Sequence, residues 1–167
     1  MKRLCLLVFS LMCFTVTNAQ SKEEALDKVI KQLYSAISGP AAQQRDTALI
    51  RSLFTADARL MPVFANKEQK IGVRVLSVDQ YLNGLSRLTK DQGFFEKELS
   101  RKIDVYGNIA QVFSTYQSFH NLEDEKPFQR GINSLQLMYD GQTWKILNIT
   151  WNAETPENPI PGRYLVN

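Results

Sequence analysis

Cysteine and histidine are scarce in this chain, and their scarcity excludes several kinds of chemistry. The two cysteines, Cys5 and Cys13, lie in an N-terminal segment that we expect to be removed, and His120 is the only histidine. A mature chain without cysteine has no disulfide scaffold, no thiol nucleophile and no thiolate-bound metal. One histidine cannot supply the three protein ligands that catalytic zinc usually has. We therefore expect neither a metal nor a cofactor.

Clustered positive charge is also lacking. The formal net charge of +3 includes Lys2 and Arg3, so removal of the N-terminal segment leaves +1 (3 − 2 = 1). No run of basic residues remains, and a nucleic-acid partner is therefore not expected. The longest apolar run, Leu4–Val16, is shorter than the roughly 20 residues that a spanning helix needs. We expect no membrane association once this segment is cleaved.

Residues 1–19 are typical of a secretory signal peptide, with a basic start, an apolar centre and small residues before the expected cleavage after Ala19. The sequence thus predicts an exported protein, periplasmic or secreted. A lipoprotein anchor at Cys13 is the alternative, but Ser10-Leu11-Met12 matches its processing signal poorly. The remaining 148 residues (167 − 19) suffice for one domain. We place that domain at 20–154, followed by an extended proline-rich tail at 155–167.

Three amphipathic helices are expected in the first half of the mature chain. Ser21 with Glu24 has the spacing of a capping box that starts the first helix, and Asp46 can cap a short second one. Ser77 with Gln80 repeats the capping-box spacing before a third helix that ends near residue 89. The apolar residues of the first helix recur every three or four positions: Leu26, Val29, Ile30, Leu33, Tyr34 and Ile37.

The second half reads as an antiparallel meander. Residues 94–151 contain four long strand patterns, with tight-turn signals at Gly107-Asn108 and Asp140-Gly141. Two shorter strands, 58–64 and 72–76, come before it. The predicted fold class is α+β: a curved antiparallel sheet of four to six strands wrapped around three N-terminal helices.

Side-chain alternation predicts what each sheet face meets. In the strand 95–105 one set of alternate residues is nearly all charged, so we expect that set to face water: Glu96, Glu98, Ser100, Lys102 and Asp104. The later strands carry apolar residues on both faces, which predicts a cover on each. We expect the helices on one face and a second copy of the chain on the other, which makes a homodimer through the sheet. Trp144 and Trp151 have opposite parity and are predicted on opposite faces.

The order of these elements resembles the nuclear transport factor 2 like superfamily, whose members have a cystatin-like cone. The resemblance is carried by the helix-to-strand corner at 53–60 and the hairpin at 140–146. Segments 113–116, 130–134 and 159–161 look most like exported bacterial members of unknown function. The resemblance implies a cone whose mouth admits a small, often apolar molecule, and dimerisation through the sheet. It does not imply one activity, because this fold hosts both enzymes and binders.

Known chemistries of the superfamily fit this sequence only in part. Ketosteroid isomerase has a base carboxylate just after the corner, where this chain has Met61-Pro62 and no carboxylate. Tyr34 falls near the position of that enzyme's oxyanion-hole tyrosine, although a core tyrosine bonded to a backbone carbonyl is the alternative. An epoxide-hydrolase relay would need Asp57, Arg74, Asp104 and Arg130 together, which the predicted faces do not favour.

Several polar and aromatic residues remain candidates for contacting a small molecule. His120 can act as a general base with Tyr116 or Tyr34 polarising a carbonyl, or it is ordinary surface. Arg130 can hold a carboxylate, or it pairs with an acid of the loop 123–125. The predicted ligand-binding residues are Tyr34, Tyr116, His120, Arg130, Asn133, Asn148 and Trp151.

Three functions stay open at this point. The favoured one is a non-catalytic protein that binds a small apolar or amphiphilic molecule. The first alternative is an enzyme of the cyclase, dehydratase or isomerase kind with non-standard residues. The second alternative is a structural dimerisation module.

Overall fold

The computed structural model describes the backbone of residues 14–166 and the side chains of residues 22–166. Most of the predicted signal peptide, residues 1–13, lies outside the described residues, so that prediction remains untested. The described elements follow one another in this order: α1 (Phe14–Ile37), α2 (Thr47–Ser52), β1 (Phe54–Ala65), β2 (Ile71–Val73), α3 (Val78–Leu88), β3 (Phe95–Tyr106), β4 (Ile109–Phe119), β5 (Gln129–Tyr139), β6 (Trp144–Ala153) and a short 3-10 helix, η1 (Gly162–Tyr164).

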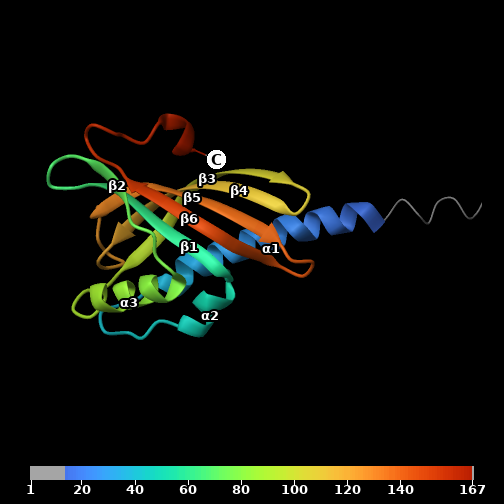
Figure 1. The fold of residues 1–167 in the computed structure, drawn as a ribbon, viewed down its shortest axis with the longest axis horizontal. Coiled ribbons are helices and arrows are strands. Elements are labelled where there is room, and N and C mark those ends of the chain that lie inside the picture. The colour runs from blue at the N-terminus through green and yellow to red at the C-terminus, as the bar shows by residue number, and fades with distance from the viewer. Residues whose placement is uncertain (1–13, 167) are drawn as a thin grey trace, which may run out of the picture.

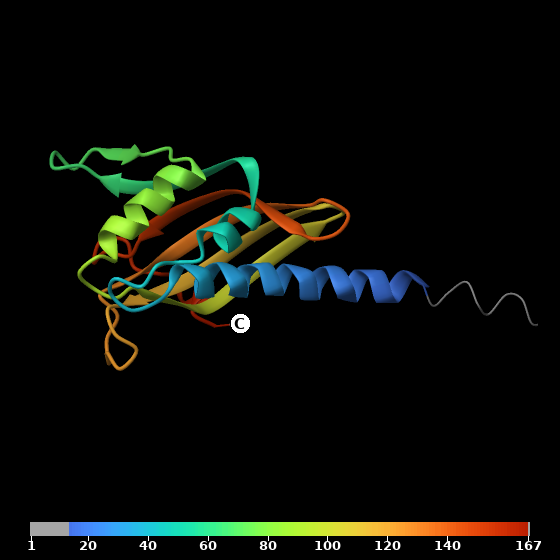
Figure 2. The ribbon, with the colours of Figure 1, turned by 90° about the horizontal axis from the view of Figure 1, so that it is seen from below.

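The strands form one six-stranded sheet in the order β2-β1-β6-β5-β4-β3 (Figure 1). All neighbours are antiparallel except β1 and β6, which run parallel and bring the first long strand beside the last. The three helices lie together on one side of this sheet (Figure 2). The predicted α+β class is confirmed.

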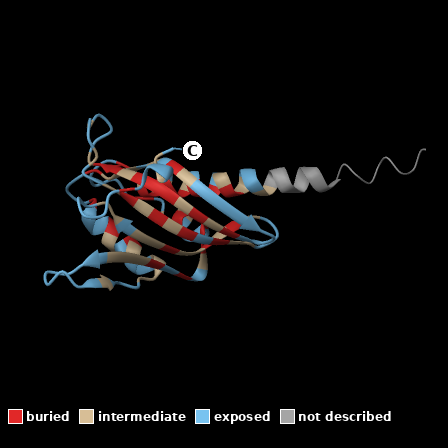
Figure 3. Cartoon of the chain, turned by 90° about the horizontal axis from the view of Figure 1, so that it is seen from above, coloured by how far each residue is buried: buried red, intermediate tan, exposed pale blue. Residues whose placement is uncertain are grey.

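The core lies between α1 and the sheet. Apolar side chains of α1 such as Leu26 and Ile30 are fully buried together with Val112, Leu135 and Ile146 of the sheet. Figure 3 shows buried residues running along the strands, interrupted by more exposed ones. This alternation is what a sheet with one well-covered face requires.

Helix starts agree with the sequence at two of three places. Asp46 Oδ1 accepts a hydrogen bond from the Leu49 amide at 2.9 Å, and Ser77 with Gln80 forms the predicted capping box. The predicted start at Ser21 is wrong for this structure, because the backbone of α1 is already helical from Phe14 and runs through the expected cleavage point. Among the described residues, no helix combines the length and apolar character needed to cross a membrane.

Two β-bulges change which way side chains point. In β3, Glu98 pairs with Tyr116 and Ser100 with Thr115, so Leu99 is an extra residue. As a result Glu96 and Glu98 before the bulge and Arg101 after it share the helix side of the sheet, where Arg101 reaches α1. The prediction that Glu96, Glu98 and Ser100 face water is wrong; Ser100 is buried on the other face, where its hydroxyl donates to the Tyr164 carbonyl of the tail.

The second bulge is in β6, where Leu147 is extra between Ile146 and Asn148. It brings both tryptophans to the helix side. Trp144 Nε1 donates to the Lys22 carbonyl of α1 at 2.8 Å, and the ring of Trp151 meets that of Tyr81 in α3 edge to face. The prediction of opposite faces for the two tryptophans is wrong, because the extra residue shifts the alternation by one.

The proline-rich tail folds back over the sheet face opposite the helices. The ring of Tyr164 stacks on Phe113 of β4 at a centroid distance of 5.6 Å, and Thr115 Oγ1 donates to the Tyr164 carbonyl at 2.6 Å. Ile160, which belongs to the same tail, is also buried. The chain's own tail therefore covers part of the face on which we expect a second copy, and the homodimer stays a prediction.

Candidate functional site

A cavity of about 290 Å³ lies between the helices and the sheet. This volume is at the lower end of the roughly 300–1,000 Å³ typical of ligand pockets. Most of its lining is apolar and comes from α1, β1, α3, β6 and the segments just before α3 and β3: Leu33, Ile37, Leu60, Leu76, Tyr81, Leu85, Leu88, Phe94, Ile149 and Trp151. The polar lining residues are Arg74, Gln80, Arg87, Glu96, Tyr116, Gln129 and Asn133.

Glu96 is the carboxylate that lines this cavity. Its Oε2 accepts a hydrogen bond from Ser118 Oγ at 3.0 Å, and its Oε1 accepts one from Asn133 Nδ2 at 3.3 Å. No lysine or arginine among the described side chains forms an ion pair with it. Burial raises the pKa of Glu96 from 4.5 to about 7, and the hydrogen bonds from Ser118 and Asn133 oppose this only in part. Both protonation states are therefore available near neutral pH, as a general acid or base requires.

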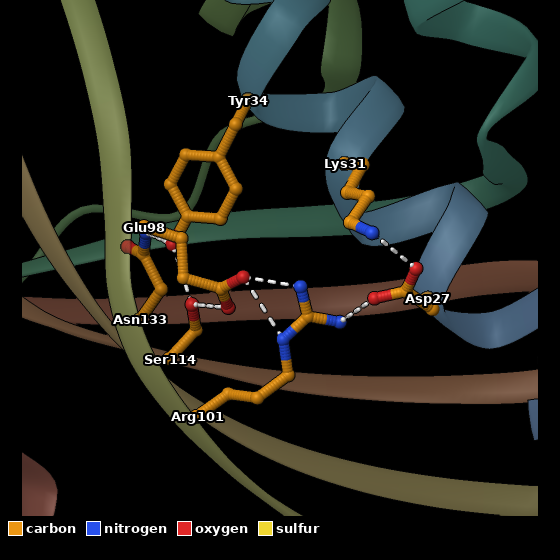
Figure 4. A network of polar contacts seen from close by, with 7 residues as sticks. All are labelled: Asp27, Lys31, Tyr34, Glu98, Arg101, Ser114 and Asn133. Atoms are coloured by element: carbon orange, nitrogen blue, oxygen red, sulfur yellow. Dashed lines mark hydrogen bonds and ion pairs between the residues drawn. The ribbon is translucent and has the colours of Figure 1, made fainter. Parts of the chain in front are cut away.

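Asn133 is held in place by a directed chain of hydrogen bonds (Figure 4). Ser114 Oγ donates its only hydrogen to the Glu98 carboxylate, so Tyr34 must be the donor in its 2.7 Å bond to Ser114. The Tyr34 oxygen then accepts from Asn133 Nδ2 at 3.1 Å. Asn133 thus divides its two amide hydrogens between Tyr34 and Glu96. The orientation of the Asn133 amide is therefore fixed, and so is the direction from which it donates to Glu96.

The same chain continues from Glu98 to the surface of α1. Arg101 Nε donates to Glu98 at 2.9 Å, and its Nη1 lies 3.0 Å from Asp27, which also pairs with Lys31 at 2.7 Å. The Lys31 hydrogen bond, assisted by Arg101, lowers the pKa of Asp27. Glu98 has a cationic partner and Glu96 has only neutral ones.

Tyr116 lines the cavity from β4 and has an unused hydroxyl. That oxygen is the one buried side-chain polar atom without a hydrogen-bond partner in the described part of the chain. The ring fits because residue 131 is glycine: a Cβ there would stand 2.6 Å from the Tyr116 hydroxyl. Burial raises the pKa of Tyr116, so the hydroxyl keeps its proton at neutral pH. A buried hydroxyl without a partner is uncommon in folded proteins.

The predicted site residues divide into two groups in the structure. Tyr116, Asn133 and Trp151 line the cavity, and Tyr34 stands directly behind Asn133. The Tyr34 hydrogen is already given to Ser114, and burial raises the pKa of its hydroxyl. Tyr34 therefore supports the wall of the cavity.

His120, Arg130 and Asn148 do not line this cavity. The His120 ring stacks on Phe128 at 4.1 Å between centroids, beyond the end of β4. Asn148 Nδ2 donates to Gln136 at 2.9 Å.

Arg130 makes a two-point contact with Glu154, at 2.7 and 3.0 Å. The expected pairing of Arg130 with an acid of the loop 123–125 is wrong. The antiparallel pairing of β5 with β6 places the end of β6, and Glu154 directly after it, beside Arg130 at the start of β5. Arg74 is the only member of the considered relay that reaches the cavity, so the structure does not assemble that relay.

Sequence reasoning missed Glu96, Arg87 and Gln80 as lining residues. In the described part of the chain, no group of three histidine, cysteine, aspartate or glutamate residues is placed to hold a metal ion. The candidate site is therefore one titratable carboxyl, one oriented amide and one free hydroxyl at the wall of an apolar cavity.

Neither a protein-family model nor a curated protein matches this sequence. Solved structures do match. A protein of unknown function from Silicibacter pomeroyi, described as nuclear transport factor 2 like, superposes with a TM-score of 0.59 and 13% identity over 81% of this chain and 98% of that one. A candidate scytalone dehydratase from Novosphingobium aromaticivorans gives a TM-score of 0.61 and 14% identity, with coverage of 84% and 89%.

A candidate ketosteroid isomerase from Shewanella frigidimarina has 19% identity and a TM-score of 0.52, and it covers 76% of this chain and 94% of that one. A protein from Nostoc punctiforme described as having a cystatin-like fold gives a TM-score of 0.61 at 10% identity, with coverage of 80% and 92%. The fold of this chain is therefore that of the nuclear transport factor 2 like proteins. Its neighbours include proteins of unknown function and proteins named as a dehydratase or an isomerase.

Proposed function

We propose that this protein binds a small, largely apolar molecule with one polar end inside the cavity. The observation that carries the proposal is the arrangement of the lining, in which apolar side chains enclose the space and Glu96, Asn133 and Tyr116 meet at its sheet side. Few convergent polar groups in an otherwise apolar hollow are typical of ligand sites. A purely structural module would not need an unpartnered tyrosine hydroxyl beside a buried carboxyl.

The helix α3 offers a way to fill the cavity without disturbing the fold. Gly84 lies on the same stripe as Tyr81 and Leu88, lines the cavity, and would have open space around an added Cβ. Gly84→Leu therefore places a side chain into the hollow while improving the helix propensity of the position. Asn83→Leu, at an exposed neighbouring position of the same helix, is the matched control.

The test uses the neutral fluorescent probe 1-N-phenylnaphthylamine, whose emission rises in apolar surroundings. We expect the parent chain and Asn83→Leu to bind it, and Gly84→Leu to bind at least ten-fold more weakly. Undiminished binding by Gly84→Leu with intact circular dichroism would show that the cavity is not the binding site. Native mass spectrometry of protein purified from its own source tests in addition for a retained molecule.

A second candidate function, an isomerase or dehydratase type of enzyme, is favoured by Glu96 in particular. A carboxylate in a water-poor cavity can take a proton from a carbon next to a carbonyl and return it to another carbon of the same molecule, so that a double bond moves with no net change in atoms. In this proposal the Tyr116 hydroxyl, which has no partner and is covered in the structure, turns toward the cavity and donates a hydrogen bond to the carbonyl oxygen. The probe is 3-cyclohexen-1-one, whose conversion to the conjugated ketone is followed by ultraviolet absorbance. Conversion by the parent chain at a rate that Glu96→Gln leaves unchanged would remove Glu96 from this role.

Export and dimerisation are proposed alongside. The support for export is the composition of residues 1–19, and intact-mass measurement of the protein from its source checks cleavage after Ala19. The support for a homodimer is the pair of apolar side chains that remain fully or partly uncovered on the face opposite the helices, Ile109 of β4 and its cross-strand neighbour Met138 of β5. Analytical ultracentrifugation gives the oligomeric state.

A further inference from the structure

We infer that the molecule received by the cavity is an amphiphilic organic anion, whose acidic group pairs with Arg74 or Arg87 where the cavity opens. This inference rests on the proposed binding function and adds the chemical class of the ligand. The first supporting observation is the net charge of the cavity lining. The charged residues among the cavity lining are Arg74, Arg87 and Glu96, so the lining carries a net charge of +1 even when Glu96 is ionised (2 − 1 = 1).

The two arginines stand at different parts of the cavity rim. Arg74 follows β2, and its backbone is fixed by the hydrogen bond from its amide to the Pro62 carbonyl at 3.1 Å. Its guanidinium lies 5.9 Å from the centroid of the Phe64 ring. Arg87 is in the last turn of α3. Both side chains are exposed, so an entering molecule meets them before it reaches Glu96.

Three other arginines of the chain are committed to carboxylates, and Arg74 and Arg87 are not. Arg51, Arg101 and Arg130 pair with Asp79, Asp27 and Glu154, respectively, at 2.7 to 3.0 Å. Among the described side chains, none forms an ion pair or hydrogen bond with the guanidinium of Arg74 or Arg87. A planar guanidinium with free donors matches a carboxylate or a phosphate through two parallel hydrogen bonds.

The apolar lining behind the rim indicates the chemistry of the rest of the ligand. Apolar residues such as Leu60, Leu85 and Trp151 enclose the middle of the cavity, where an acyl chain or a ring is favoured over a polar group. The volume of about 290 Å³ limits this body to a chain of medium length or to two or three small rings. A small carboxylate with an apolar middle and a second polar group at its inner end satisfies the rim, the apolar interior and Glu96 together.

The test compares three probes of equal chain length, octanoate, octyl phosphate and 1-octanol, by isothermal titration calorimetry at pH 7.5 in low salt. We expect octanoate to bind at least ten-fold more tightly than octanol, because only the anion gains charge-assisted hydrogen bonds. The double variant Arg74→Gln/Arg87→Gln is expected to abolish this preference and leave octanol binding unchanged. The double variant Arg59→Gln/Arg163→Gln removes the same charge from exposed positions outside the cavity and is expected to keep the preference.

The outcomes separate this inference from the proposed function. Binding of octanol as tight as that of both anions, or an anion preference that survives in the double variant, overturns the anionic ligand while leaving cavity binding in place. Failure of the neutral fluorescent probe to bind overturns the proposed function itself. A preference for octyl phosphate over octanoate would identify the acidic group as a phosphate ester, and the reverse a carboxylate; either supports the class.

Discussion

Replacing Glu96 with glutamine removes a buried titratable group and keeps its shape. In the native protein burial raises the pKa of this carboxyl from 4.5 to about 7. The folded state therefore binds a proton more tightly than the unfolded state. Stability depends on pH wherever the two states differ in bound protons, and it falls with rising pH where the folded state holds more of them. Glu96 should thus contribute its full stability below pH 4.5, and that contribution should be lost as the pH rises to about 7.

The size of this effect follows from the interval between the two pKa values. About 2.5 pH units (7 − 4.5) at about 1.4 kcal/mol per unit amount to about 3 kcal/mol. Glu96→Gln has no proton to bind in this range and escapes the loss. At pH 8 we expect the variant to be more stable than the parent chain by up to about 3 kcal/mol, or roughly 5–10 °C in the unfolding midpoint of a domain of this size. A native residue that lowers stability is typical of a functional site.

The assay is urea unfolding followed by circular dichroism at steps from pH 4.5 to pH 8. The quantity to plot is the difference in unfolding free energy between variant and parent, because groups common to both chains cancel in it. Glu123→Gln, in an exposed loop, is the control for loss of one negative charge. Parallel stability curves for Glu96→Gln and the parent chain over this range would refute the reasoning, since they would mean that Glu96 titrates alike in both states.

Three further substitutions test other parts of the structure. Gly131→Ala places a Cβ 2.4 Å from the Asn152 carbonyl oxygen and 2.6 Å from the Tyr116 hydroxyl; we expect a loss of about 1–3 kcal/mol in urea unfolding, and an unchanged midpoint would contradict the packing of Tyr116. Ser77→Ala removes the capping box of α3 and should cost about 1 kcal/mol by the same measurement. Ile160→Ala should lower stability by about 2 kcal/mol if the tail packs as described, whereas a tail that is detached in solution would make the change neutral.

The fold was predictable from sequence because its elements are locally encoded. Caps at Asp46 and Ser77, apolar spacing along α1 and turn signals at Gly107 and Gly141 all act within a few residues of where they stand. Each of these signals agrees with the final architecture, which is the consistency that a foldable sequence shows. The order of elements then restricts the fold to very few choices.

The candidate site was harder to predict from the sequence, because it depends on contacts between residues that are distant in the sequence. Alternation in β3 places Glu96 and Glu98 on one face, and their charge argues that this face meets water. Glu98 is tolerated inside because the bulge at Leu99 turns Arg101 to the same face, where Arg101 and Ser114 from β4 contact it. Glu96 is tolerated because Ser118 and Asn133 donate hydrogen bonds to it. A bulge leaves no composition signal in a single strand, so the sequence does not reveal the change of face.

The contrast between the two inward carboxyls explains why the site is centred on Glu96. Glu98 is balanced by Arg101, so protonation of Glu98 would break a partly buried ion pair. Glu96 is contacted by the neutral donors Ser118 and Asn133, and it can gain or lose a proton without breaking an ion pair. The network behind Asn133 stays fixed while this happens, because every hydrogen in it is already assigned. A group free to exchange protons on a rigid support, at the wall of an apolar cavity, is what both binding of a polar end and proton transfer require.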